Sequence, residues 1–128
     1  MKKPADVQHY KLLHVNWTME PGEEPSWRKW LAFADARADV DVERGLSFTM
    51  DDMAILTAID GMGLAIAMTA FVADDIAAGR LVKPFGNRFE MPVSFKHFLV
   101  YPKAARRSAK VKAFRNWIRG EIAAMPAV

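Results

Sequence analysis

Apolar segments with the length of β-strands recur along the chain, separated by amphipathic or turn-rich segments. Five strands are predicted in this way, at residues 11–17, 40–48, 64–67, 81–85 and 93–101. Residues 64–67 (LAIA) are wholly apolar, which is typical of a strand buried on both faces. Residues 93–101 (VSFKHFLVY) have the strongest strand pattern, whereas residues 40–48 also fit two shorter pieces broken at Arg44 and Gly45.

The segments between these strands have the periodicity of amphipathic helices. Ser26 has the position of an N-cap for a helix that extends to about Ala36. The buried stripe of this helix is predicted to contain Trp27, Trp30, Leu31 and Ala34. Thr49 and Asp52 have capping-box spacing, which predicts a second helix that begins at Thr49 and stops at Gly61.

Two further helices follow. Residues 71–78 predict a short helix with Gly79 at the position after its C-cap. Ser108 has the position of an N-cap for the final helix, which presents one apolar face. That face consists of Val111, Phe114, Trp117, Ile118 and Ile122.

The alternation of strands and helices predicts an α/β fold with a mainly parallel sheet. A chain of 128 residues is long enough for one domain with a hydrophobic core. The strand at 93–101 and the helix after Ser108 come last in the chain, and they lack an obvious earlier partner. Both are therefore expected to pack against another protein surface.

Composition narrows the functional classes. The chain has no cysteine, which excludes disulfides, zinc–thiolate sites and cysteine nucleophiles. No apolar run approaches the roughly 20 residues of a membrane span, and no secretory signal is recognisable, so a cytoplasmic protein is expected. From Lys103 onward there are seven basic residues and one acidic residue. A solvated helix face explains this charge, and contact with nucleic acid or an acidic partner is the alternative.

Candidate catalytic groups are sparse. His9, His14 and His97 lack the spacing of metal ligands, and the acidic pairs are sequence neighbours whose side chains diverge on a helix. The GMG segment lacks the third glycine of a dinucleotide-binding loop and precedes a strand. Trp17 ends a strand and enters a loop, where an aromatic side chain can line a ligand cleft. No cofactor, metal site or catalytic activity is predicted.

Three segments in order resemble one family. Residues 46–85 (LSFTMDDMAILTAIDGMGLAIAMTAFVADDIAAGRLVKPF) closely resemble the effector-binding domain of LysR-type transcriptional regulators, in particular the subgroup typified by the glycine-cleavage activator. Residues 95–118 are similar to the closing strand, loop and helix of that domain, and residues 25–34 to its tryptophan-containing helix. The resemblance implies a two-lobed fold like that of type II periplasmic binding proteins.

The resemblance also implies a domain organisation. Residues 1–11 would be an N-terminal segment, residues 12–88 the second lobe, and residues 89–128 a strand and helix belonging to the first lobe. The chain would then lack the helix-turn-helix and most of the first lobe. It would sense a small-molecule effector without binding operator DNA by itself.

An effector site follows from the same resemblance, at the carboxyl ends of the second-lobe strands. The implied site residues are Trp17, Phe48, Thr49, Met50, Leu64 and Ile66. The Thr49 hydroxyl and the first free amides of the following helix would receive a carboxylate, although the same residue fits a simple N-cap. Because half of the pocket would come from the missing lobe, this chain alone is expected to bind small carboxylates weakly or not at all.

Two other functions remain open at the level of sequence. The chain can be a free-standing interaction module, in which the unpaired last strand and helix recruit a second copy and form a homodimer or larger oligomer. Alternatively, it can be a small enzyme that uses His14 or His97 with Asp51 or Asp52. Turnover of a substrate would be needed to support the second alternative.

Overall fold

A computed structural model describes residues 1–17, 24–36, 40–93 and 97–125. Three short strands form one parallel sheet in the order β2–β1–β3. They are β1 (Leu12–Val15), β2 (Gly45–Phe48) and β3 (Leu64–Ala65). Leu12 in the central strand lies opposite Gly45 on one side and Leu64 on the other. The predicted α/β class with a parallel sheet is therefore confirmed.

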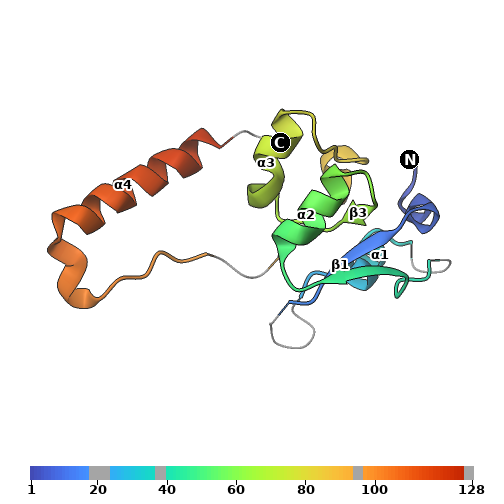
Figure 1. Ribbon diagram of the computed structural model, residues 1–128, viewed down its shortest axis with the longest axis horizontal. Coiled ribbons are helices and arrows are strands. Elements are labelled where there is room, and N and C mark those ends of the chain that lie inside the picture. The colour runs from blue at the N-terminus through green and yellow to red at the C-terminus, as the bar shows by residue number, and fades with distance from the viewer. Residues whose placement is uncertain (18–23, 37–39, 94–96, 126–128) are drawn as a thin grey trace.

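Helices cover the sheet and extend beyond it (Figure 1). The α-helices are α1 (Trp27–Phe33), α2 (Asp51–Ile59), α3 (Thr69–Ala77) and α4 (Ala109–Ala124). The 3₁₀ helices are η1 (Pro4–His9), η2 (Gly86–Phe89) and η3 (Lys103–Arg107). In Figure 1, α2 lies in front of the sheet and α1 behind it, while α4 stands apart from both. The sheet with its two covering layers is called the body below.

The body has a hydrophobic core that includes β1 and α1. Val7, Leu12, Trp27 and Leu31 form one buried cluster that joins η1, β1 and α1. The Trp27 indole N–H donates a buried hydrogen bond of 3.0 Å to the Leu13 carbonyl oxygen. Because successive side chains of a strand point to opposite faces, Leu12 packs in this cluster and the equally buried Leu13 points to the other face.

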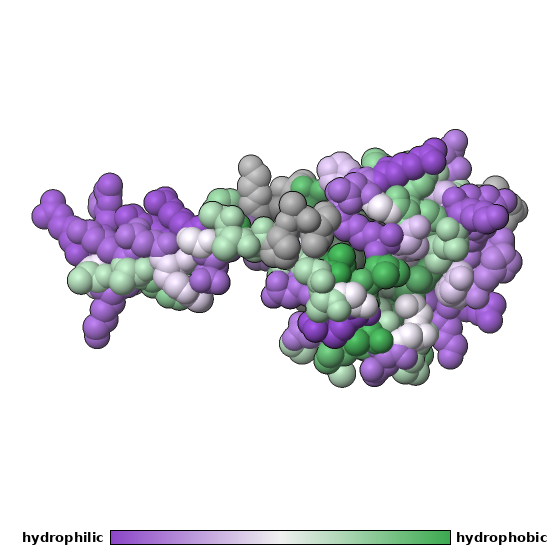
Figure 2. All heavy atoms as spheres, turned by 90° about the horizontal axis from the view of Figure 1, so that it is seen from above, coloured by the Kyte–Doolittle hydropathy of each residue, from purple (hydrophilic) through white to green (hydrophobic). Residues whose placement is uncertain are grey.

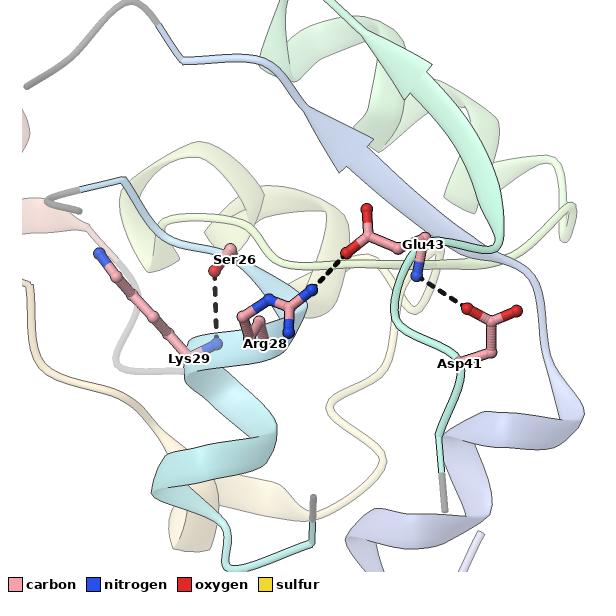
Figure 3. Close-up of polar contacts among 5 residues, drawn as sticks. All are labelled: Ser26, Arg28, Lys29, Asp41 and Glu43. Carbon is pink, nitrogen blue, oxygen red and sulfur yellow. Dashed lines mark hydrogen bonds and ion pairs between the residues drawn. The ribbon is translucent and has the colours of Figure 1, made fainter. Parts of the chain in front are cut away.

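The first helix begins where the sequence predicts and ends earlier. The Ser26 hydroxyl accepts a hydrogen bond from the Lys29 backbone N–H at 3.3 Å, so the predicted N-cap is confirmed (Figure 3). The helix ends at Phe33 because Asp35 adopts a left-handed conformation with φ of 52°. The Ala36 N–H then bonds back to the Leu31 carbonyl at 2.8 Å, which closes the helix end.

The segment before β2 is a turn rather than a strand. Asp41 accepts a hydrogen bond from the Glu43 backbone N–H at 3.2 Å, and Glu43 pairs with Arg28 of α1 at 2.5 Å (Figure 3). Both side chains of this ion pair are largely exposed, so it contributes little stability. Of the two strand-like pieces predicted within residues 40–48, only Gly45–Phe48 forms a strand.

Two glycines allow the outer strands to approach β1. A Cβ atom on Gly45 would lie 1.8 Å from the Leu12 carbonyl oxygen, and one on Gly63 would lie 2.6 Å from the Lys11 carbonyl oxygen. Gly45 also has φ of 147°, a conformation that other residues rarely adopt. Any larger residue at either position would push an outer strand away from the central one.

The helices in front of the sheet end as predicted. Gly61 and Gly79 follow α2 and α3 with φ of 74° and 72°, the left-handed conformation that terminates many helices. Ala54 and Ile55 of α2 are buried, as are Val72 and Ala73 of α3. These helices therefore bury a face of their own, as amphipathic helices beside a sheet do.

Three other strand predictions are wrong in part or in full. The strand predicted at residues 64–67 spans only Leu64–Ala65 and is half-buried, because β1 pairs with it on one side only. Residues 81–85 form no strand. Val93 and residues 97–101 also form no strand, and residues 94–96 of that prediction lie outside the described part of the chain. An isolated strand has no neighbour to complete its hydrogen bonds, and Phe98 and Val100 are strongly exposed here.

The last helix projects from the body. Figure 2 shows it as a largely hydrophilic arm on which some apolar residues are visible. Phe114, Trp117 and Ile122 on its apolar side are 49%, 56% and 63% exposed. The amphipathic helix predicted from the sequence is thus confirmed. Ser108 occupies the predicted N-cap position, but its side chain makes no capping hydrogen bond.

Replacement of Gly63 tests the close approach of β3 to β1. We expect Gly63→Ala to lower the free energy of unfolding by about 1–3 kcal/mol, because the new Cβ would overlap backbone that can move only by shifting a strand. Gly120→Ala in α4 is the matched control, since no atom lies within 4 Å of its added Cβ. Urea unfolding followed by tryptophan fluorescence measures both. Equal midpoints for Gly63→Ala and the unaltered chain would contradict the expectation.

Candidate functional site

An apolar cleft of about 600 Å³ lies beside β3. Its lining includes Leu64 and Ile66, Val72 and Ile76 of α3, and Trp17. Residues 80–86 and the two tryptophans of α1 also line it. A cleft of this size and apolar character is typical of small-molecule sites.

Four aromatic rings make up one wall of the cleft. Trp30 stacks on Phe85 with ring centroids 5.8 Å apart, and it meets Trp27 edge-on at 5.6 Å. Phe89 meets Phe85 edge-on at 5.6 Å and receives a hydrogen bond of 3.0 Å on its carbonyl oxygen from the Trp30 indole N–H. This network fixes the rings in place, so the wall is organised before any ligand binds.

Charged groups in the cleft lining carry ion pairs. Arg80 contacts the Asp75 carboxylate at 2.6 Å. The Lys83 ammonium contacts the Glu90 carboxylate and lies 2.8 Å from the Asn87 side-chain oxygen. Each of these two cations is paired with a carboxylate, so together these residues give the cleft no net charge.

A second cavity of about 420 Å³ adjoins the cleft at the carboxyl end of β1. Trp17, Pro25, Trp27 and Ile66 line both spaces. The other lining residues of the second cavity include His14, Asn16, Glu24 and Ser26. The two spaces therefore differ in chemistry, one apolar and one with several polar side chains, and share a wall that contains Trp17.

The predicted site residues fall into two groups. Trp17, Leu64 and Ile66 line the apolar cleft. Phe48, Thr49 and Met50 lie at the carboxyl end of β2, and none of them lines either cavity. The order β2–β1–β3 explains the separation, since the central strand lies between the two groups.

The region after β2 differs from the predicted cap. Met50, not Thr49, occupies the N-cap position of α2, and no side chain caps the helix there. The capping box predicted for Thr49 and Asp52 is therefore wrong, because the helix begins one residue later than its spacing requires. Asp51 and Asp52 lie in the first turn instead, where the helix dipole favours carboxylates.

Asp51 is the carboxylate with the most unusual surroundings in this region. Its Oδ1 atom is buried and has no hydrogen-bond partner. Removal from water raises the pKa of Asp51, repulsion by Asp52 raises it further, and a bond to its own backbone N–H opposes both. The charged form of Asp51 is thus less favourable in the folded protein than in the unfolded chain.

His14 and His97 lie in different surroundings. His14 lies in β1, and its Nε2 atom is buried without a hydrogen-bond partner. His97 is exposed and meets the Phe71 ring edge-on at 5.9 Å. Among the described residues, no group of three or more His, Asp or Glu side chains could hold a metal ion.

The cleft, the parallel sheet and the order of elements can be compared with known proteins. Residues 3–123 match the family described as LysR substrate binding domain. The chain belongs to this family. The resemblance found in the sequence is thereby confirmed, together with the type II periplasmic-binding-protein-like fold that it implied. No solved structure matches the chain significantly.

Several bacterial regulators contain a LysR domain similar to this one. The glycine cleavage system transcriptional activator of Escherichia coli K12 is 30% identical over 126 residues, which cover 97% of this chain and 38% of that protein. The regulators PerR and DsdC of the same strain are 26% and 27% identical over 95% and 89% of this chain. The chain thus spans less than two-fifths of the length of these relatives.

The LysR domain also contains features that the sequence did not indicate. The aromatic wall unites Trp27 and Trp30 with Phe85 and Phe89, which are more than fifty residues away along the chain. The helical stripe predicted the burial of the tryptophans, but no periodicity links them to residues 85–89.

None of the helices in the described residues has the length and apolar character that crossing a lipid bilayer requires.

Replacement of Asp51 tests the effect of its surroundings on stability. Because its pKa is raised in the folded state, the native protein binds this proton more tightly than the unfolded chain does. The stability of the unaltered chain relative to Asp51→Asn should therefore rise as the pH falls from 7 through the raised pKa towards the ordinary value of 3.8. Urea unfolding at several pH values measures this difference.

Asp52→Asn is the matched variant, since it removes one source of repulsion and leaves the burial of Asp51 unchanged. We expect it to weaken the pH dependence without abolishing it. A difference between the unaltered chain and Asp51→Asn that stays constant with pH would contradict the expectation.

Proposed function

We propose that this LysR domain senses a small-molecule effector on behalf of a cytoplasmic transcriptional regulator. The observation that carries the proposal is the apolar cleft beside β3, which lies in a chain that matches the substrate-binding domain over nearly its whole length. The relatives are named as transcriptional regulators and activators, which supports a regulatory role without catalysis. The proposal involves no catalysis, no cofactor and no direct contact of this chain with DNA.

We propose a division of the chain into the two lobes of such a sensor. Residues 12–88 would form the second lobe after an N-terminal segment at 1–11, and residues 89–128 would belong to the first lobe. The position of the sheet supports this division, since its three strands fall within residues 12–65. The projection of α4 away from the sheet supports it as well.

The effector would lie along the carboxyl edge of the sheet. Trp17, Leu64 and Ile66 would form its apolar surroundings, while Phe48, Thr49 and Met50 would approach it from the end of β2. Because Thr49 does not cap α2, its hydroxyl and the free amides of the first turn are candidates to receive a carboxylate. We expect such binding by this chain alone to be weak.

Calorimetric titration of the chain with acetate, pyruvate and benzoate tests this placement. We expect weak binding, and Thr49→Val should weaken it a further three- to tenfold, roughly the value of one hydrogen bond. Thr57→Val is the matched control, since its hydroxyl bonds to Met53 within α2. A dissociation constant near 1 μM, equivalent to about 8 kcal/mol, would contradict the expectation of weak binding. Equal binding by Thr49→Val would contradict the role of Thr49.

A second candidate function is assembly with another copy of the chain. The observation that favours it is the exposed apolar side of α4, where Phe114 and Trp117 lie side by side with ring centroids 5.5 Å apart. Apolar side chains gathered in this way commonly mark an interface. A homodimer that exchanges its C-terminal helices would cover them.

Light scattering over a range of concentrations tests this assembly. We expect a mass above that of the 14.4 kDa monomer at high concentration, and a shift towards the monomer when Phe114 and Trp117 are both replaced by serine. Phe33→Ser is the matched control, since Phe33 is similarly exposed but lies on α1. A monomeric mass for the unaltered chain at high concentration would overturn the proposal.

A further inference from the structure

The apolar cleft beside β3 is large enough for a small organic molecule. Its volume of about 600 Å³ falls within the usual range for small-molecule sites. For comparison, an apolar cavity of roughly 150 Å³ in another protein is enough to hold benzene. The cleft therefore has room for a molecule of one or two fused rings.

Three aromatic rings in the wall of the cleft are not fully covered by the protein. Trp30, Phe85 and Phe89 line the cleft, and all three residues are half-buried. Trp30 stacks on Phe85, and Phe89 meets both of these rings edge-on. The Trp30 indole N–H donates to the Phe89 carbonyl oxygen, which holds the rings in place. A flat ring can extend this cluster by stacking or by edge-on contact, with a gain beyond that of simple burial, so the wall favours an aromatic ligand over a saturated one.

The charged groups that line the cleft already have partners. Arg80 pairs with the Asp75 carboxylate at 2.6 Å, and Lys83 pairs with the Glu90 carboxylate. A charged head group would have to compete with these side chains for its partner, or lose its water without gaining one, which is unfavourable. The described lining therefore favours an uncharged ligand.

Two methionines allow the cleft to adapt to the outline of a ligand. Met68 and Met91 both line it. The unbranched thioether side chain fills irregular gaps and makes favourable contacts with the edges of aromatic rings. The cleft can therefore close around a ring whose shape it does not match beforehand.

From these features we infer that the cleft binds an uncharged, planar aromatic molecule of one or two fused rings. The ring lies against Trp30 and Phe85, and no charged head group is required. The inference rests on the proposed sensing function and specifies the chemical class of its effector. This site is separate from the carboxylate placed at Thr49, which lies at the end of β2 and outside the described lining of the cleft.

Titration of the ¹⁵N-labelled chain, followed by NMR chemical shifts, detects weak binding and locates it. Three probes of similar size separate the properties of the ligand: β-naphthol is aromatic and uncharged, β-decalol is its saturated counterpart, and β-naphthoate carries a carboxylate. We expect β-naphthol to bind roughly two- to tenfold more tightly than β-decalol, and about tenfold or more above β-naphthoate. The indole N–H signals of Trp27 and Trp30 should shift, because both side chains line the cleft.

Phe85→Leu tests the aromatic wall. The change retains apolar volume and removes the ring that stacks on Trp30, so it should weaken β-naphthol roughly two- to tenfold and leave β-decalol nearly unchanged. Phe33→Leu is the matched control, since it makes the same exchange on α1 outside the described lining, and it should leave all three probes unchanged. A ¹⁵N spectrum that matches the unaltered chain away from the substituted residue establishes that each variant folds. The comparison of the three probes on the unaltered chain depends on neither variant.

The possible outcomes distinguish this inference from the function on which it rests. Equal affinity for β-naphthol and β-naphthoate would overturn the uncharged ligand, and equal affinity for β-naphthol and β-decalol would overturn the aromatic ring. Shifts confined to residues outside the cleft would overturn the site. If no probe bound while benzoate or pyruvate shifted residues around Thr49, the inference would fall and the sensing function would stand. If neither set of probes bound at millimolar concentration, both would fall.

Discussion

The close approach of two glycines to one strand is the constraint on which the body depends. Gly45 and Gly63 bring β2 and β3 against β1 at positions where any Cβ atom would overlap main-chain oxygen. The central strand can then bury Leu12 on one face and Leu13 on the other. The Trp27 indole ties α1 to the same strand through the Leu13 carbonyl. The helices and both cavities take their positions from this short, tightly flanked strand.

Local signals in the sequence predicted most of the body. Ser26 at the start of α1 and Gly61 and Gly79 after α2 and α3 act through contacts within a few residues, and the structure contains all three as predicted. The strand at residues 93–101 was predicted from an equally clear pattern, yet its described residues form none. An apolar run becomes a strand only when a neighbouring strand completes its hydrogen bonds, and no local pattern reports whether that neighbour exists.

Local sequence patterns also predicted the candidate site only in part. Trp17 could be assigned to a cleft because it follows a strand, whereas Leu64 and Ile66 were implied by the family resemblance. The aromatic wall depends on Phe85 and Phe89 reaching back to Trp30, a contact between distant parts of the chain. The buried Nε2 atom of His14 could not be foreseen either, since a histidine in an apolar strand usually finds a partner. Both features arise from packing rather than from spacing along the chain.

The separation of α4 from the sheet has a consequence for how the chain unfolds. The core clusters around β1, whereas the apolar side of α4 is largely exposed. A 16-residue helix without a packed face is only marginally stable in water, so α4 would fray and re-form while the body stays folded. Its amides would exchange with solvent far faster than those of β1. The body would therefore unfold as one cooperative unit, whereas the helical order of α4 would depend on contact with another surface.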